Sequence, residues 1–587
     1  MVKQLMKSIR EFKLATILTP TFVIGEVIIE ALIPFLISLL INDIKAGCDL
    51  SVILGYAWKL VALSLLSLLC GYLAGIYCAK ASTGFARNLR YDIFTNIQKF
   101  SFSNIDKFSS ASLVTRLTTD IQNVQMAFMM IIRTAVRAPL NLIFSFTMAY
   151  IMGGTMAVIF LIIIPFLGIG LYLIVRSVMP IFKKGFPLFD KITRIVEENV
   201  KGIRVVKSFV REDFEINKFD ETSNDIRKMF TRAEQIIALN NPLMQISIYA
   251  VMLFVLMFGS EMIIKTNATS LDVGQLSTLM TYGFQIMVSL MMLSMVFVMI
   301  TFSEESSKRI VEVLNEKSSI TSKANAITEV KDGSIDFDHV RFKYSSTAER
   351  PVLENIDVHI KSGETIGIIG GTGSAKSSFV QLIPRLYDVT EGTVRVGKED
   401  VRDYDLVTLR DSVAMVLQKN VLFSGTIADN IRWGNKDATL EEVKHVCHLA
   451  CADEFIEQMP DGYDTWIEQG GTNVSGGQKQ RLCIARALLK QPKILIMDDS
   501  TSAVDTKTDA IIRKAMKEYI PETTKIIIAQ RTSSVEDADR IIVLDGGQID
   551  AIGTSEELLK TNQIYREVYL SQNKQGTEEI VEEGGVR

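Results

Sequence analysis

The chain has 587 residues, a hydrophobic content of 48% and a formal net charge of −4. This length allows two or more domains, and the acidic balance leaves no basic footprint, so nucleic acid is excluded as a partner. The six cysteines show no CxxC spacing and there are four histidines, which argues against a disulfide framework and a zinc site. The apolar residues concentrate in the first half of the chain, which is expected to lie in a membrane.

Residues 1–13 predict a short amphipathic helix on the inner membrane surface. The segment lacks the small-residue cleavage site of a signal peptide, and its apolar run continues too far for one. An amphipathic elbow helix in the membrane interface fits the pattern better. Its apolar and basic side chains fall on opposite helical faces, with Leu5, Ile9 and Phe12 on one face and Lys3, Lys7 and Arg10 on the other.

Residues 14–305 predict an all-α transmembrane domain of six helices. A helix needs roughly 20 apolar residues to cross a bilayer. Two long connections, 81–126 and 180–242, are helix-periodic and rich in Lys and Arg, so they and the N-terminus are expected in the cytoplasm as helical extensions of the spans. Apolar runs of sufficient length lie near 14–42, 55–80, 127–152, 155–179, 243–265 and 272–301.

Charged side chains in the predicted spans leave two interpretations open. Glu26 and Glu30 lie one turn apart in the first span, where an ionised group is costly. They either bind a proton or cation, or they form hydrogen bonds between packed helices near Pro34. Arg133 and Arg137 are expected near the inner interface with snorkelling side chains.

The sixth span carries a methionine cluster. Methionine is flexible and polarisable, which suits a cavity that accepts varied apolar molecules. Lipid-facing filler explains the same cluster equally well, so both interpretations stay open. The cluster consists of Met287, Met291, Met292, Met295 and Met299.

After a linker at 306–330, in which a charged helix is followed by a polar stretch, residues 331–572 predict a soluble α/β nucleotide-binding domain. The strand-like ETIGIIG leads into GGTGSAKSS, in the strand–loop–helix order of a P-loop. Backbone amides of this loop are expected around phosphate oxygens, with Lys376 at the β- and γ-phosphates and Ser377 on magnesium. Ala375 replaces the glycine that usually precedes the lysine, and its methyl group is expected to weaken ATP binding without abolishing it. The rest of the loop is Gly370, Gly371, Thr372, Gly373, Ser374 and Ser378.

VSGGQ predicts a second phosphate-binding surface at the start of an amphipathic helix. Ser475 and the amides of Gly476 and Gly477, followed by Gln478, would stand at the helix N-terminus. This surface is expected to lie too far from the P-loop of its own domain to share its ATP. Two such domains must then pair head to tail, with each ATP between the P-loop of one domain and the VSGGQ sequence of the other.

Together, GGTGSAKSS, VSGGQ and PKILIMDDSTSAVD resemble the ATP-binding machinery of ABC ATPases. Stretches 101–125 and 197–219 resemble the two intracellular coupling regions of ABC exporters of the multidrug-resistance type, and the resemblance extends to about residue 570. It implies that Tyr344 stacks on adenine, and that Gln418 meets the magnesium and contacts the coupling helices.

Two positions depart from the family's catalytic pattern. Asp498 ends the strand KILIMD and is expected to hold magnesium directly or through water. Asp499 stands where the family has the glutamate that orients the attacking water. Aspartate is one methylene shorter, and a displacement of about 1 Å costs on the order of a hundredfold in rate. Gln530 replaces the family's histidine; it can hydrogen-bond the γ-phosphate but cannot become cationic. Gln469 likewise stands where a glutamate usually precedes the signature.

Two losses at one catalytic site, beside an intact signature, resemble the degenerate-site subunit of a heterodimeric bacterial ABC exporter. The resemblance implies a six-helix transmembrane domain with a P-loop ABC ATPase domain that binds ATP and Mg²⁺. Hydrolysis would then require a second half-transporter as partner. The assembly would move hydrophobic or amphipathic molecules out through the plasma membrane, with the ATPase domain in the cytoplasm.

Two other assemblies stay open. One is a homodimeric exporter with a slow ATPase based on Asp499, and the other is an ATP-gated channel or regulatory subunit. Turnover by the purified chain identifies the first, and passive flux uncoupled from hydrolysis identifies the second. The acidic end of the chain, 573–587, is expected to be a solvated, disordered tail.

Overall fold

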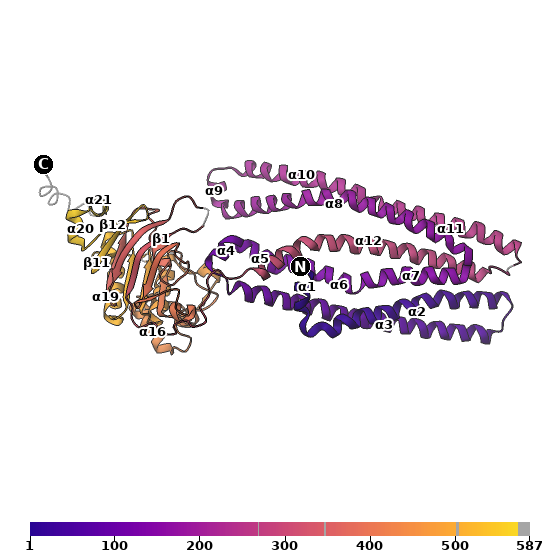
Figure 1. Ribbon diagram of the computed structural model, residues 1–587, viewed down its shortest axis with the longest axis horizontal. Helices are drawn as coiled ribbons and strands as arrows, with labels where there is room; N and C mark the ends of the chain where they lie inside the picture. Colours follow the sequence, from indigo (N-terminus) through magenta and orange to yellow (C-terminus); the bar gives the residue numbers. More distant parts are fainter. Residues whose placement is uncertain (268, 346–347, 501–503, 573–587) are drawn as a thin grey trace. The chain divides into compact units, whose positions relative to one another are not determined.

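The structure is a computed structural model that describes residues 1–267, 269–345, 348–500 and 504–572, except for the side chains at 183, 186 and 190 (Figure 1). The tail expected at 573–587 lies outside the described residues. The chain divides into two compact units. Met1–Lys99 and Ser109–Glu316 form the membrane unit, while Phe100–Phe108 and Lys317–Arg587 form the ATPase unit.

The membrane unit consists of helices throughout its described residues. The segment predicted as an elbow forms α1 and the 3₁₀ helix η1, which has non-helical backbone angles at Arg10, and Leu5 and Ile9 are buried. The helical elements are α1 (Val2–Leu5), η1 (Met6–Phe12), α2 (Lys13–Lys45), α3 (Leu50–Ile97), α5 (Ser110–Thr115), the π-helical turn η2 (Arg116–Asp120), α6 (Ile121–Ile132), α7 (Thr134–Gly153), η3 (Gly154–Ala157), α8 (Val158–Lys201), α9 (Ile203–Ser208), α10 (Glu212–Ala238), α11 (Asn240–Lys265) and α12 (Val273–Asn315).

Five helical stretches of the described chain are long and apolar enough to cross a membrane. The longest, Ser110–Lys201, has 92 residues and contains both the third and the fourth predicted span. Gly154 interrupts it with a φ of 50°, a conformation that glycine adopts without strain, and α7 and α8 are separate helices on either side of this turn. The six predicted spans therefore fall within these five stretches.

Small residues let the membrane helices pack closely. A Cβ on Gly283 of α12 would lie 3.0 Å from Phe160 of α8 and from Val251 of α11. Tyr282 is fully buried beside it and donates a hydrogen bond of 2.6 Å to the Ala31 carbonyl of α2. Helix α12 therefore lies at the centre of the unit's apolar core.

Ion pairs tie η2 to the cytoplasmic part of α12. The fully buried Asp120 accepts hydrogen bonds from Arg309 Nε at 2.9 Å and Nη2 at 2.5 Å. Arg116 lies 2.9 Å from Glu312. Helix α12 continues to Asn315, so the first part of the linker segment 306–330 is helical.

Two sheets form the centre of the ATPase unit. The six-stranded sheet is parallel except for its edge strand β12, in the order β12 (Gln548–Gly553), β11 (Arg540–Asp545), β3 (Thr365–Ile369), β10 (Thr524–Ile528), β9 (Ile494–Asp498) and β6 (Val413–Val416). The four-stranded antiparallel sheet has the order β2 (Leu353–Ile360), β1 (Ile335–Phe342), β4 (Glu391–Val396) and β5 (Glu399–Asp400). A short ribbon pairs β7 (Gly425–Thr426) with β8 (Trp466–Ile467).

Helices complete the ATPase unit. The predicted α/β architecture is confirmed, since parallel strands β3, β9 and β10 end at the phosphate-binding and acidic motifs. The helices are α13 (Lys376–Gln381), α14 (Leu406–Ser412), α15 (Ile427–Arg432), α16 (Leu440–Leu449), α17 (Asp453–Ile456), α18 (Gly476–Leu489), α19 (Thr506–Tyr519), α20 (Ser555–Thr561) and α21 (Gln563–Gln572), with 3₁₀ turns η4 (Gly462–Asp464), η5 (Gln469–Gly471) and η6 (Thr532–Ser534).

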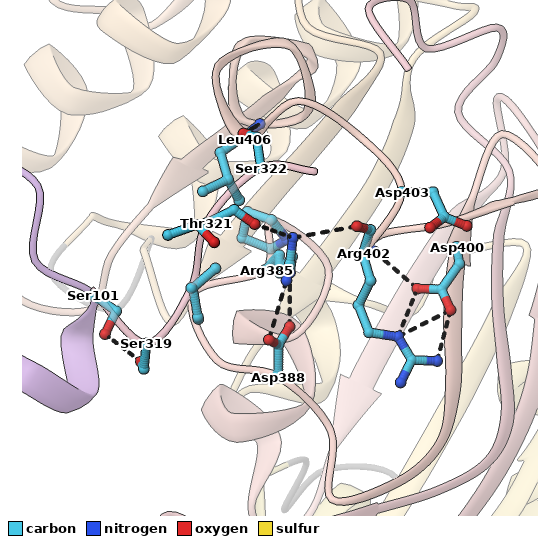
Figure 2. Close-up of polar contacts among 12 residues, drawn as sticks. Ser101, Ser319, Thr321, Ser322, Arg385, Asp388, Asp400, Arg402, Asp403 and Leu406 are labelled. Carbon is cyan, nitrogen blue, oxygen red and sulfur yellow. Dashed lines mark hydrogen bonds and ion pairs between the residues drawn. The ribbon is translucent and has the colours of Figure 1, made fainter. Parts of the chain in front are cut away.

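The segment after α12 is fastened to the ATPase unit by polar contacts, which Figure 2 shows. Ser319 meets Ser101 with 2.7 Å between their Oγ atoms, and the Thr321 carbonyl accepts a hydrogen bond from the buried Arg385 at 3.4 Å. Arg385 is itself held by Asp388 at 2.7 Å. Helix α4 (Phe102–Phe108), from the first predicted coupling region, is thereby part of the ATPase unit.

Candidate nucleotide-binding site

The P-loop connects the buried strand β3 to α13. A Cβ on Gly370 would lie 2.1 Å from the Leu544 carbonyl oxygen, so only glycine fits there. A Cβ on Gly371 or Gly373 would meet no atom within 4 Å, and this side of the loop is open to a phosphate group. The arrangement agrees with the predicted loop, in which backbone amides surround phosphate oxygens.

Ala375 adopts the left-handed conformation, with φ 69° and ψ 20°. An L-residue costs roughly 1–2 kcal/mol in this region, whereas glycine does not. The sequence indicated a methyl group too close to the ligand, and the structure adds backbone strain at the same position. The substitution of glycine by alanine therefore acts through the loop's own conformation as well.

Lys376 folds back on its loop. Its Nζ donates hydrogen bonds of 2.8 Å to the carbonyls of both Gly370 and Gly371. Burial lowers the pKa of Lys376, and the nearby charges of Asp498 and Asp499 partly offset that shift. The cation thus stands between the phosphate loop and the acidic end of β9, where it can meet the terminal phosphates of a nucleotide.

Asp498 is buried at the end of β9. Burial raises its pKa, while a side-chain hydrogen bond with Ser377 acts in the opposite direction. A hydroxyl and a carboxylate in contact are the oxygen ligands that Mg²⁺ takes in P-loop enzymes. These residues fit the ion, whose charge would neutralise the phosphates when it is bound.

Asp499 and Gln530, the two altered catalytic positions, are hydrogen-bonded to each other. Gln530 Nε2 donates to Asp499 Oδ2 at 2.7 Å, and Gln418 Nε2 donates to the same oxygen at 3.3 Å. Asp499 has a φ of 48°, and its amide donates to the Ile528 carbonyl at the end of β10 at 2.9 Å. Burial raises the pKa of Asp499, against the effect of the two amide donors.

Tyr344 presents a half-exposed ring beside the P-loop helix. Its side chain is 46% exposed, and its hydroxyl lies 2.8 Å from Ser378 Oγ. The ring of Tyr387 meets it edge-on at 5.0 Å, which leaves a face for a flat ligand. This position is compatible with stacking on adenine, as the resemblance implies.

The signature serine caps α18. Ser475 Oγ accepts a hydrogen bond from the Gln478 amide at 3.3 Å, and Gln478 Oε1 accepts one from the Ser475 amide at 2.9 Å. Val474, where the family usually has leucine, is buried in an apolar core shared with Leu482. The P-loop helix belongs to a different core with Phe379, so the two phosphate-binding surfaces stand on separate packed layers.

The structure gives Glu26 and Glu30 a partner that the sequence did not reveal. Arg137 of α7 donates to Glu26 Oε1 at 2.9 Å and to both Glu30 oxygens at 2.7 and 2.9 Å. The snorkelling expected of Arg137 is therefore wrong, because its guanidinium turns toward α2. Of the methionine cluster, Met287 is fully buried in the core while Met295 is 58% exposed.

Sequence reasoning missed the contact of α4 with Tyr387. The Tyr387 hydroxyl donates to Asp106 at 2.9 Å, and its ring lies 6.0 Å from Phe102. Burial and Asp106 both raise the pKa of Tyr387. Tyr387 thus touches both Tyr344 and α4, and no sequence signal marks such a long-range pair.

Comparison with known proteins agrees with this architecture. Residues 16–290 match the family described as ABC transporter transmembrane region, and residues 353–502 match the family described as ABC transporter. A solved structure, a bacterial Atm1-family ABC exporter with ATP bound, superposes with a TM-score of 0.82 over 96% of this chain and 98% of that chain, at 24% identity. The chain therefore has the fold of an ABC exporter.

Curated relatives match along almost their whole length. The uncharacterized ABC transporter ATP-binding protein YfiB of Bacillus subtilis is 34% identical over 94% of this chain and 96% of its own length. The ATP-dependent lipid A-core flippase of Desulfotalea psychrophila is 31% identical over 85% of this chain and 87% of its own. The chain is a multi-pass membrane protein of the ABC transporter family, with a transmembrane region and a cytoplasmic ATP-binding domain in one polypeptide.

Proposed function

We propose that this chain is the degenerate-site half of a heterodimeric, ATP-driven exporter of hydrophobic or amphipathic molecules. The observation that carries the proposal is the pairing of Asp499 with Gln530 at 2.7 Å. The carboxylate that must orient water, that of Asp499, is short and buried, and it accepts hydrogen bonds from two side-chain amides. The group that should stabilise charge on the γ-phosphate is a neutral amide engaged with that carboxylate.

The binding groups around this pair support ATP binding without efficient hydrolysis. The open P-loop, Lys376 and the contact of Ser377 with Asp498 retain the features that hold a nucleotide and magnesium. A site that holds ATP and turns it over slowly keeps two ATPase domains engaged. Hydrolysis would then occur at the second site, where the partner contributes its P-loop and this chain contributes Ser475 and the α18 N-terminus.

The substrate class rests on the membrane unit and on one relative. A transporter whose spans expose methionine and aromatic side chains suits apolar or amphipathic molecules. The flippase relative is named for its action on lipid A-core. Both favour an amphipathic substrate for this chain.

Turnover by the purified chain tests the proposal against the homodimer. The isolated chain should bind ATP and hydrolyse it slowly, because no intact catalytic site forms from two copies. Brisk hydrolysis that Asp499→Asn abolishes would instead show that two copies form a working ATPase.

In the assembled transporter, two substitutions in this chain should have unequal effects. Lys376→Ala weakens ATP binding at the degenerate site and should leave much of the hydrolysis intact. Gly477→Asp spoils the phosphate-binding surface of the competent site and should nearly abolish hydrolysis. Equal losses for the two variants would contradict the asymmetry.

A further inference from the structure

The cytoplasmic extensions of α8 and α10, which lie side by side in Figure 1, enclose an open groove of about 630 Å³. The two helices pack closely at the groove, because a Cβ on Gly185 of α8 would lie 3.2 Å from Phe230 of α10. Three cations line the groove, Lys184 from α8 and Lys228 and Arg232 from α10. The groove belongs wholly to the membrane unit and shares no residue with the nucleotide site.

Cations outnumber carboxylates among the described residues of the groove. Three cations face one acidic residue there, Asp225. Within the described part of the chain, none of the three cations has an ion pair with a carboxylate. Lys228 and Arg232 are four residues apart on one helical face, a like-charge spacing that destabilises a helix unless an anion offsets it.

On α8 the groove lies a short distance beyond the hydrocarbon core, on its cytoplasmic side. A helix rises 1.5 Å per residue, so about 20 residues cross the roughly 30 Å hydrocarbon core. Counted from Val158 at the outer end of α8, the core ends near residue 178. Lys184 follows about 9 Å further on, and Ile181 and Leu188 give the groove apolar walls beside its cations.

We propose that this groove binds the headgroup of an anionic phospholipid from the inner leaflet. A phosphate ester meets the cations while the first carbons of the lipid lie on the apolar walls. Basic pockets between membrane helices on the cytoplasmic side bind anionic headgroups for these reasons. Lipid bound there joins α8 to α10 on the cytoplasmic side of the membrane.

The experiment measures lipid binding to the purified full-length chain in detergent micelles, with short-chain phosphatidylglycerol as the probe and native mass spectrometry as the readout. The groove variant combines Lys184→Gln, Lys228→Gln and Arg232→Gln. Its matched control combines Lys201→Gln, Lys207→Gln and Lys218→Gln, which remove the same charge from α8, α9 and α10. These control lysines are already paired with Glu197, Glu212 and Glu198.

Each cation near a membrane surface contributes about fivefold to the binding of anionic lipid, so the groove variant should lose on the order of a hundredfold in affinity. The control should keep most of the wild-type affinity, and phosphatidylcholine should bind weakly to all three proteins. Equal losses in both variants, or equal binding of phosphatidylcholine, would overturn the proposal. Displacement by inorganic phosphate at similar concentrations would assign a free-anion site instead, and loss of lipid binding on assembly with a partner half-transporter would assign a protein interface.

Discussion

Gln530 Nε2 donates a hydrogen bond of 2.7 Å to Asp499 Oδ2, and this contact joins the ends of neighbouring parallel strands β10 and β9. It occupies the carboxylate that would otherwise turn toward an attacking water. The two departures from the family pattern are therefore one structural unit. If the family's residue is restored at only one of these two positions, the residue at the other position keeps a hydrogen-bond partner that no longer matches it.

Asp499→Glu combined with Gln530→His should raise ATP hydrolysis by about 10- to 100-fold, because the longer carboxylate reaches the water and the imidazole can become cationic. Steady-state phosphate release measures the effect. Asp545→Glu, the same lengthening at the exposed end of β11, should leave the rate unchanged. An unchanged rate in the double variant would place the defect at Ala375 or in the partner's signature.

Ala375→Gly should stabilise the ATPase unit by about 1 kcal/mol and tighten ATP binding, because glycine removes the strain of the left-handed backbone. Chemical denaturation and nucleotide titration measure the two effects. Ala510→Gly, in the exposed middle of α19, should act in the opposite direction and cost about 0.5–1 kcal/mol. A loss of stability in both variants would contradict backbone strain at Ala375.

Ser475→Ala should cost about 1 kcal/mol of stability through the lost helix cap, and it should also reduce hydrolysis by the assembled transporter. Thr554→Ala removes the equivalent capping box from α20, far from the signature sequence. That control should lose similar stability and keep its hydrolysis. Equal hydrolysis by the two variants would limit Ser475 to a capping role.

Arg137→Gln should destabilise the membrane unit by about 3–5 kcal/mol, because it leaves two carboxylates without their shared cation. Glu26 would suffer most, since its side chain is 9% exposed and its Oε2 has no hydrogen-bond partner among the described residues. Adding Glu26→Gln and Glu30→Gln should recover most of the loss. Thermal unfolding in detergent measures this, and Arg133→Gln, at the residue that precedes α7, should be nearly neutral.

Asp498→Asn should stabilise the nucleotide-free protein at neutral pH. The raised pKa of Asp498 means that the folded chain holds this proton more tightly than the unfolded chain. The free energy of unfolding therefore falls as pH rises from the unfolded pKa through the folded one, and the cost persists above it. The stability gained by Asp498→Asn should disappear in acid, and with Mg-ATP bound the variant should be less stable than the wild type. Thermal unfolding at neutral and at acidic pH measures these effects.

Local motifs account for what the sequence predicted well. GGTGSAKSS and VSGGQ act through a few consecutive backbone groups, so their spacing alone predicts a loop and a helix start. Apolar runs likewise predict spans one at a time. The third and fourth spans meet at Gly154 without a polar loop, and that continuity explains how two predicted spans lie in one helical stretch.

Pairs that are distant in sequence account for what the sequence could not predict. Arg137 meets Glu26 across more than a hundred residues, and Tyr387 meets Asp106 across an even longer separation. Each of these residues, considered alone, has a common role that needs no distant partner. Their pairing follows only from how α2 packs on α7 and from how α4 packs on the ATPase unit.

The ATPase unit is discontinuous in sequence, because it includes Phe100–Phe108 as well as the chain from Lys317 onward. A fragment that begins near residue 331 would lack α4 and the segment after α12, in which the Thr321 carbonyl accepts a hydrogen bond from Arg385. It would therefore expose Tyr387 and its neighbouring aromatic rings to water. Such a fragment should be prone to self-association. A synthetic peptide that spans α4 should bind it and restore its solubility.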